Sequence, residues 1–254
     1  MKSIDLYGFL ISEAEHSFSG WDFSYLETRI ENAPLTWSYL SKILPFVRKS
    51  TSLLDMGTGG GEFLSILVPL PQHTCATEAY EPNVPIAKKR LEPLGVKVFY
   101  LEDEEDLPFM NNEFDLVINR HEYYNANEVY RILKNNGIFI TQQVGDQNDN
   151  KLRLILTGKS NSGSSVEWNL DYAKDELEKV GFKIEEDYED ITYTRIFGVG
   201  AIAFYLTAIP WELPDFSVKK YYHKLVEINE KIKEKGYIDL DMNNHRFLIK
   251  AKKS

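Results

Sequence analysis

A glycine-rich turn is the clearest candidate ligand site in the sequence. Residues 55–62 read Asp-Met-Gly-Thr-Gly-Gly-Gly-Glu, at the end of a short apolar run. Glycines let a chain turn tightly and let a ligand approach the backbone closely. The lysine that a phosphate-binding P-loop requires is absent, and the third glycine of a dinucleotide fingerprint would fall on Glu62 or Leu64. What remains is an acid, Asp55, followed by alternate glycines.

Further ionisable residues follow at useful spacings. Glu78 lies about 20 residues beyond the glycines, where a carboxylate can accept both hydroxyls of a ribose. An acid such as Asp55 at a strand end can be a simple cap, but beside the glycines we favour a role facing the ligand. His121 could remove a proton from a substrate, because the pKa of a histidine is ordinarily about 6.5. A hydrogen-bonding or structural histidine is the alternative.

Composition limits the classes of partner. The 254 residues include 29 basic and 39 acidic ones, which gives a formal net charge of -10 and disfavours nucleic acid. The single cysteine, Cys75, cannot build a disulfide framework or a zinc cluster. Acidic residues interrupt the N-terminus, so we expect no signal peptide, and the longest uncharged stretch, 196–211, is short of the roughly 18–20 residues that span a bilayer. We expect a cytoplasmic protein with no membrane segment.

The elements that must position these residues alternate along the chain. Short apolar strands followed by amphipathic helices are typical of a parallel sheet covered on both faces. Beyond residue 145 the pattern loosens, and 196–209 could be a helix or a strand. The sequence predicts strands at 52–56, 74–79, 96–100, 114–118, 138–141, 182–193 and 245–250, and helices at 40–47, 63–67, 83–91, 125–133, 171–180 and 218–232.

Five motifs in register over about residues 50–145 resemble the class I S-adenosylmethionine-dependent methyltransferases. They are the glycine turn, the acid Glu78, the acidic run 102–106 followed by Leu-Pro-Phe, the segment Phe-Asp-Leu-Val at 114–117, and Leu-Lys-Asn-Asn-Gly at 133–137. The resemblance implies an α/β fold of Rossmann-like, doubly wound type. Its seven-stranded sheet would be mostly parallel with an antiparallel last strand. It also implies S-adenosyl-L-methionine as the cofactor.

The resemblance assigns roles to individual positions. Asp55 would fix the turn and face the methionine amino group, Glu78 would bind the ribose, and Tyr80 would pack on the adenine or in the core. Asp103 would lie beside the adenine amino group, and the backbone of Glu104 beside the ring. The expected cofactor-binding residues are Asp55, Gly57, Thr58, Gly59, Gly61, Glu78, Ala79, Tyr80, Asp103, Glu104 and Asn119.

The segment 118–124 would border the methyl acceptor. It lacks the prolines of the methyltransferases that act on adenine or cytosine. His121 is the candidate catalytic residue, although methyl transfer can proceed without a dedicated base. The aromatic segment 16–29 is interpreted either as a lid over the cofactor or as packing, and 198–211 resembles a bacterial group of small methyltransferases. The candidate substrate residues are Trp21, Tyr25, Arg120, Tyr123 and Trp211.

We therefore expect one methyltransferase domain over 1–254. It would comprise an N-terminal segment or lid (1–40), a cofactor-binding half (41–145) and a substrate-side half (146–254) with an insertion near 197–240. The predicted activity is methyl transfer from S-adenosyl-L-methionine to a small molecule, without a metal. An RNA or protein methyltransferase and a non-catalytic binding protein are the alternatives. The acceptor and the oligomeric state stay open.

Overall fold

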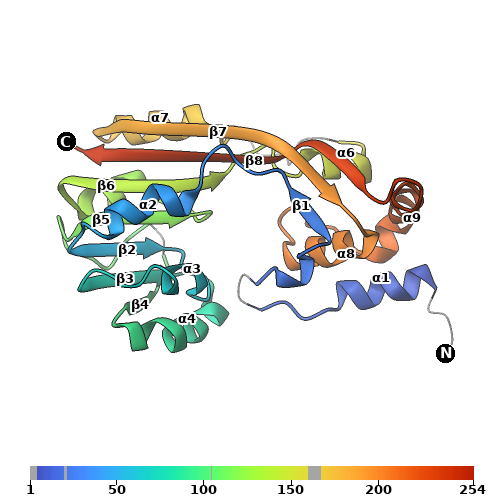
Figure 1. Ribbon diagram of the computed structural model, residues 1–254, viewed down its shortest axis with the longest axis horizontal. Coiled ribbons are helices and arrows are strands. Elements are labelled where there is room, and N and C mark those ends of the chain that lie inside the picture. Colours follow the sequence, from blue (N-terminus) through green and yellow to red (C-terminus); the bar gives the residue numbers. More distant parts are fainter. Residues whose placement is uncertain (1–4, 20–21, 104, 160–166) are drawn as a thin grey trace. The chain divides into compact units, whose positions relative to one another are not determined.

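Two compact units make up the chain. The computed structural model describes residues 5–19, 22–103, 105–159 and 167–254 (Figure 1). One unit, here called the sheet unit, comprises 36–145, 168–189 and 246–254. The other, the helical unit, comprises 1–35, 146–167 and 190–245. The glycine turn and the segment that follows the strand at 114–120 both belong to the sheet unit.

The strands hydrogen-bond in the order β1-β7-β8-β6-β5-β2-β3-β4. β2, β3, β4, β5 and β6 pair in parallel, and the last strand, β8, runs antiparallel to β6, as predicted. The predicted strand count of seven was wrong, because Ile30–Asn32 pairs antiparallel with the end of β7. The bounds are β1 Ile30–Asn32, β2 Ser52–Met56, β3 His73–Glu78, β4 Lys97–Tyr100, β5 Phe114–Arg120, β6 Leu133–Val144, β7 Phe182–Ile196 and β8 Ile238–Lys253.

Five helices of the sheet unit lie where helical spacing and caps predict them. Ser38 caps α2, and Asn125 caps α5 by accepting hydrogen bonds from the backbone N–H groups of residues 127 and 128. The helix after the glycine turn is shorter than predicted and ends at Ser65. The bounds are α2 Tyr39–Val47, α3 Glu62–Ser65, α4 Val84–Leu91, α5 Ala126–Ile132 and α7 Leu170–Lys179.

The core of the sheet unit explains why its strands read as continuous apolar runs. Every residue of β2 is buried, because helices cover both faces of a parallel sheet. Phe114, Val117 and Phe139 have no solvent-exposed surface. Because β2 pairs in parallel with both β3 and β5, the carboxyl ends of the three strands meet at one end of the sheet, where the candidate site lies.

The helical unit contains α1 Leu6–Ala14, α6 Asn150–Thr157, α8 Val199–Ala208 and α9 Val218–Lys235. The ambiguous stretch 196–209 is the end of β7 followed by α8. Seven of the ten residues of α8 are buried, so the helix has no polar face that would reveal its period. None of the helices in the described residues combines the length and the apolar character that a membrane span needs.

Candidate functional site

The glycine turn joins β2 to α3 and depends on left-handed backbone. Gly57, Gly59 and Gly61 have φ angles of 66°, 62° and 81°, which side chains rarely tolerate. Thr58 Oγ1 donates a hydrogen bond of 2.8 Å to a carboxyl oxygen of Asp55 inside the turn. Burial raises the pKa of Asp55 to about 7, and the nearby charge of Glu78 adds to the rise, while the Thr58 hydrogen bond and the charge of Arg120 oppose it.

Glu78 connects the turn to the end of β3. One of its carboxylate oxygens accepts a hydrogen bond of 2.6 Å from the backbone N–H of Gly59, and the other accepts one of 2.8 Å from that of Tyr80. The residue is only 2% exposed. A carboxylate has about four acceptor positions, so holding two N–H groups is compatible with accepting the hydroxyls of a ribose.

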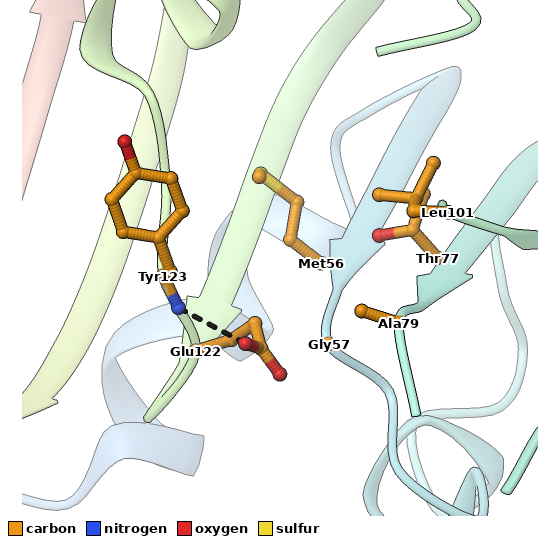
Figure 2. Close-up of a pocket in the computed structure, with 7 residues that line it drawn as sticks. All are labelled: Met56, Gly57, Thr77, Ala79, Leu101, Glu122 and Tyr123. Carbon is orange, nitrogen blue, oxygen red and sulfur yellow. Dashed lines mark hydrogen bonds between the residues drawn. The ribbon is translucent and has the colours of Figure 1, made fainter. Parts of the chain in front are cut away.

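A small pocket opens in front of Gly57. It is lined by Met56, Gly57, Thr77, Ala79, Leu101, Glu122 and Tyr123. Figure 2 shows the Glu122 side chain turned toward the Gly57 backbone, while its carboxylate accepts a hydrogen bond from the N–H of Tyr123. A side chain built on Gly57 would collide with Glu122. Sequence reasoning did not single out Glu122, because the type and spacing of the residue do not reveal where its side chain points.

Asn119, predicted to bind cofactor, is fully buried at the end of β5. Its Oδ1 accepts hydrogen bonds from Thr141 Oγ1 (2.9 Å) and Gln143 Nε2 (2.6 Å). Its Nδ2 has no hydrogen-bond partner among the described residues. An unpartnered buried amide is costly, and β5 pairs with β2 at Asn119 and Met56, one residue before Gly57. A polar ligand at the turn would supply the missing partner.

Arg120 lies at the end of β5 against two aromatic rings. Its guanidinium carbon is 5.1 Å from the ring centre of Phe63 and 5.8 Å from that of Tyr39. The residue is exposed, and within the described part of the chain it forms no ion pair. The charge nevertheless acts on Asp55, whose pKa it lowers. The end of β5 therefore presents a positive group beside the acidic turn.

His121 follows Arg120 in a left-handed conformation, with φ 62°. Its backbone N–H donates to the carbonyl of Gln142 (2.8 Å), and its Nε2 lies 3.0 Å from Gln142 Nε2. Desolvation by the groups packed around the ring, and then the charges of Arg246 and Arg120, hold the pKa of His121 below its usual range, although the residue is exposed by its surface area.

The acidic loop after β4 is held by α5. Arg131 donates hydrogen bonds to the carbonyls of Leu107 (2.9 Å) and Phe109 (2.7 Å). Tyr123 Oη donates to Glu105 (2.5 Å), which links the loop to the segment after β5. Asp103 is exposed and accepts a hydrogen bond from the N–H of Glu105, Tyr80 is 60% exposed, and Glu104 lies outside the described residues.

The remaining acceptor candidates belong to the helical unit. Tyr25 Oη donates to Glu13 (3.0 Å), and its ring stacks on His16 with centres 3.7 Å apart. Trp211 is 59% exposed just beyond α8. Trp21 lies outside the described residues. The roles of these three residues at a methyl acceptor stay predictions.

Comparison with known proteins finds a methyltransferase domain in the sheet unit. Residues 54–141 match the family model described as a methyltransferase domain. The BH2331 protein of Bacillus halodurans superposes with a TM-score of 0.58 at 20% identity, over 85% of this chain and 99% of that one. An S-adenosylmethionine-dependent methyltransferase of Mesorhizobium loti gives 0.52 at 14%, over 84% and 95%. The [4+2]-cyclase SpnF gives 0.51 at 15%, over 96% and 92%. None of the curated proteins compared with the chain matches it.

Residues 54–141 carry a methyltransferase domain, and the chain shares its fold with S-adenosylmethionine-dependent methyltransferases, which implies S-adenosylmethionine as the cofactor. The residues at the turn fit that molecule. A cradle without Cβ atoms at Gly57, a buried acid at Glu78 and an unpartnered amide at Asn119 lie at the carboxyl ends of three neighbouring strands. The neighbours' shared fold alone does not define the reaction, since SpnF is a cyclase.

Proposed function

We propose that the protein is an enzyme that transfers a methyl group from S-adenosylmethionine to a small molecule. The observation that carries this proposal is the pair of buried acids on either side of one glycine turn. Asp55 is 5% exposed and Glu78 is 2% exposed. Burying two carboxylates beside each other is unfavourable unless partners compensate it. A ligand with a cationic amino group and a ribose would add to the hydrogen bonds that the turn already gives both acids.

Each predicted cofactor-binding residue would contact a different part of S-adenosylmethionine. Glu78 would accept the ribose hydroxyls, Asp55 the amino group, and Asp103 the adenine amino group beside the backbone of residue 104. When bound, S-adenosylmethionine supplies a methyl group on a positively charged sulfur. The chain's own contribution is to orient that methyl group toward the acceptor and to exclude water from it.

The acceptor would lie beyond the end of β5. Arg120 presents a guanidinium without an ion pair among the described residues, which suits a small acceptor with a carboxylate or another anionic group. The formal net charge of -10 favours a small molecule over RNA. A protein acceptor stays an alternative. A non-catalytic binding role also stays an alternative, because a fold alone does not define a reaction.

Calorimetric titration with S-adenosylmethionine tests the proposal. We expect binding by the wild type and its loss in the Asp55→Ala, Glu78→Ala double variant. Glu102→Ala, an exposed change in the neighbouring loop, should bind normally. A screen of metabolite fractions for S-adenosylhomocysteine formation then tests turnover. Absence of binding by the wild type would refute the proposal, and binding without turnover in any fraction would favour the non-catalytic role.

A further inference from the structure

The side chains of Trp37, Gln142 and His121 form a hydrogen-bonded series that ends at the His121 ring. Trp37 Nε1 donates a hydrogen bond of 2.9 Å to Gln142 Oε1, and Gln142 Nε2 lies 3.0 Å from His121 Nε2. All three residues belong to the sheet unit. Trp37 is 8% exposed and Gln142 is 4% exposed, so water has little access to compete for their polar atoms.

This hydrogen-bonded series determines which nitrogen of His121 carries the proton. An indole N–H can only donate, so the amide group of Gln142 must turn its oxygen toward Trp37. The amide nitrogen then faces His121 and donates to it. Because Gln142 donates, Nε2 of His121 must be the acceptor, and the proton of the neutral ring must reside on Nδ1.

We propose that His121 is a positioning hydrogen-bond donor through Nδ1–H, locked in that tautomer by Gln142 and Trp37, and that with Arg120 it receives an oxyanion of the bound ligand. The ligand part of this proposal rests on the proposed function, whereas the tautomer lock does not. A ring that donates through Nδ1 and has Nε2 occupied cannot take a proton from a methyl acceptor. The reacting group must therefore lose any proton elsewhere or arrive already deprotonated.

The surroundings of His121 support a neutral ring. The backbone N–H of His121 donates to the carbonyl of the same Gln142, which fixes the residue from two sides. The groups packed around the imidazole and the positive charges of Arg246 and Arg120 both disfavour a second proton on it, although the residue as a whole is exposed. Arg120 itself can only donate hydrogen bonds. Two neighbouring residues thus offer donors, and the matching ligand chemistry is a carboxylate or a similar oxyanion.

Nitrogen-15 NMR of histidine-labelled protein tests the lock without requiring activity. His121→Asn assigns the signal among the five histidines. We expect a neutral ring with the proton on Nδ1 from pH 6 to pH 8. In Gln142→Glu, the carboxylate should draw a proton to Nε2 and raise the pKa of His121. Trp37→Phe should yield a mixture of the two His121 tautomers, and its thermal unfolding should show that the variant is still folded. A wild-type ring protonated on Nε2, or one that titrates near pH 6.5, would overturn the proposal.

The same signal locates the oxyanion. Methylthioadenosine lacks the amino-acid part of S-adenosylhomocysteine, of which only the carboxylate, and not the ammonium group, can accept a hydrogen bond from Nδ1–H. A shift of the His121 Nδ1–H signal with S-adenosylhomocysteine alone would assign the oxyanion to the cofactor. A shift when sodium acetate, but not sodium chloride, is added to the S-adenosylhomocysteine complex would assign it to the acceptor. Either shift should be lost in Arg120→Gln. If neither carboxylate moves the signal, the donor role is wrong, even where calorimetry shows that the cofactor binds.

Discussion

The ionisation of Asp55 couples the stability of the protein to ligand binding. Burial raises the pKa of this carboxyl to about 7 in the folded chain, against 3.8 as the ordinary value. Between these pH values the folded protein holds a proton that the unfolded chain has released. The contribution of Asp55 to stability is therefore fully present below about pH 4 and is lost as the pH rises toward 7. A cationic amino group beside Asp55 would favour the ionised form, so ligand affinity should change in the opposite direction.

We predict that Asp55→Asn removes this pH dependence. The variant's free energy of unfolding, relative to wild type, should rise between pH 4 and pH 8 by up to about 4 kcal/mol, since each pKa unit corresponds to about 1.4 kcal/mol. Denaturant titrations at the two pH values measure the difference. Glu102→Gln, an exposed acid, is the control and should change little. Equal effects of Asp55→Asn at both pH values would show that the carboxyl is ionised in the folded protein.

Glu122 leads to a second prediction at the residue scale. Its side chain occupies the space in front of Gly57, where the family's cofactor would approach. Glu122→Ala should therefore bind S-adenosylhomocysteine several-fold more tightly, because no side chain has to be displaced. Calorimetry of the variant beside Glu102→Ala measures this. Weaker binding by Glu122→Ala would instead make Glu122 a direct ligand of the cofactor.

Residue type and spacing singled out two of the acids at the glycine turn. Asp55 and Glu78 follow strands and lie at a fixed spacing from glycines, and the structure places them in contact with the turn. Glu122, Gln142 and Trp37 were not foreseen. Trp37 and Gln142 are 105 positions apart, and a hydrogen bond over that separation depends on how the segment before α2 packs against β6 rather than on any local pattern.

At the scale of elements, α8 organises the helical unit. Phe204 is 1% exposed, and its ring contacts those of Phe18 and Tyr25, with centres 6.1 and 4.9 Å apart. The aromatic segment before β1 thus packs on a helix more than 170 residues later. The sequence did not predict strand β1 or the start of α8. β1 has only three residues, too few to show an alternation of apolar and polar side chains, and α8 is buried on nearly all sides, so it shows no helical period.

We predict that Phe204→Ala destabilises the protein by about 3–5 kcal/mol, which is the usual cost of removing a buried phenylalanine. Phe197→Ala, at a residue 38% exposed beside Tyr237, should cost much less. Thermal and denaturant unfolding of both variants provide the comparison. Similar small losses for the two would mean that the aromatic contacts of Phe204 contribute little to stability.

At the scale of the whole molecule, the methyltransferase family model matches only one of the two units. The methyltransferase match, residues 54–141, lies entirely in the sheet unit. Expected substrate residues in the helical unit, Tyr25 and Trp211, have no counterpart in that match. A sheet unit that binds the cofactor still needs a cover that excludes water from a reactive methyl donor. The segment 16–29 is our candidate for that cover.

We predict that residues 16–29 close over the bound cofactor. S-adenosylhomocysteine should then protect this segment from limited proteolysis, and Trp21→Ala should weaken cofactor or acceptor binding while leaving thermal stability unchanged. Phe204→Ala separates the two interpretations of the segment, because it removes the ring on which Phe18 and Tyr25 pack. If the segment is only packing, Phe204→Ala should expose it to protease and the cofactor should not restore protection. If it is a lid, the cofactor should protect it in the wild type at concentrations that saturate the glycine turn, and Asp55→Ala with Glu78→Ala should abolish that protection.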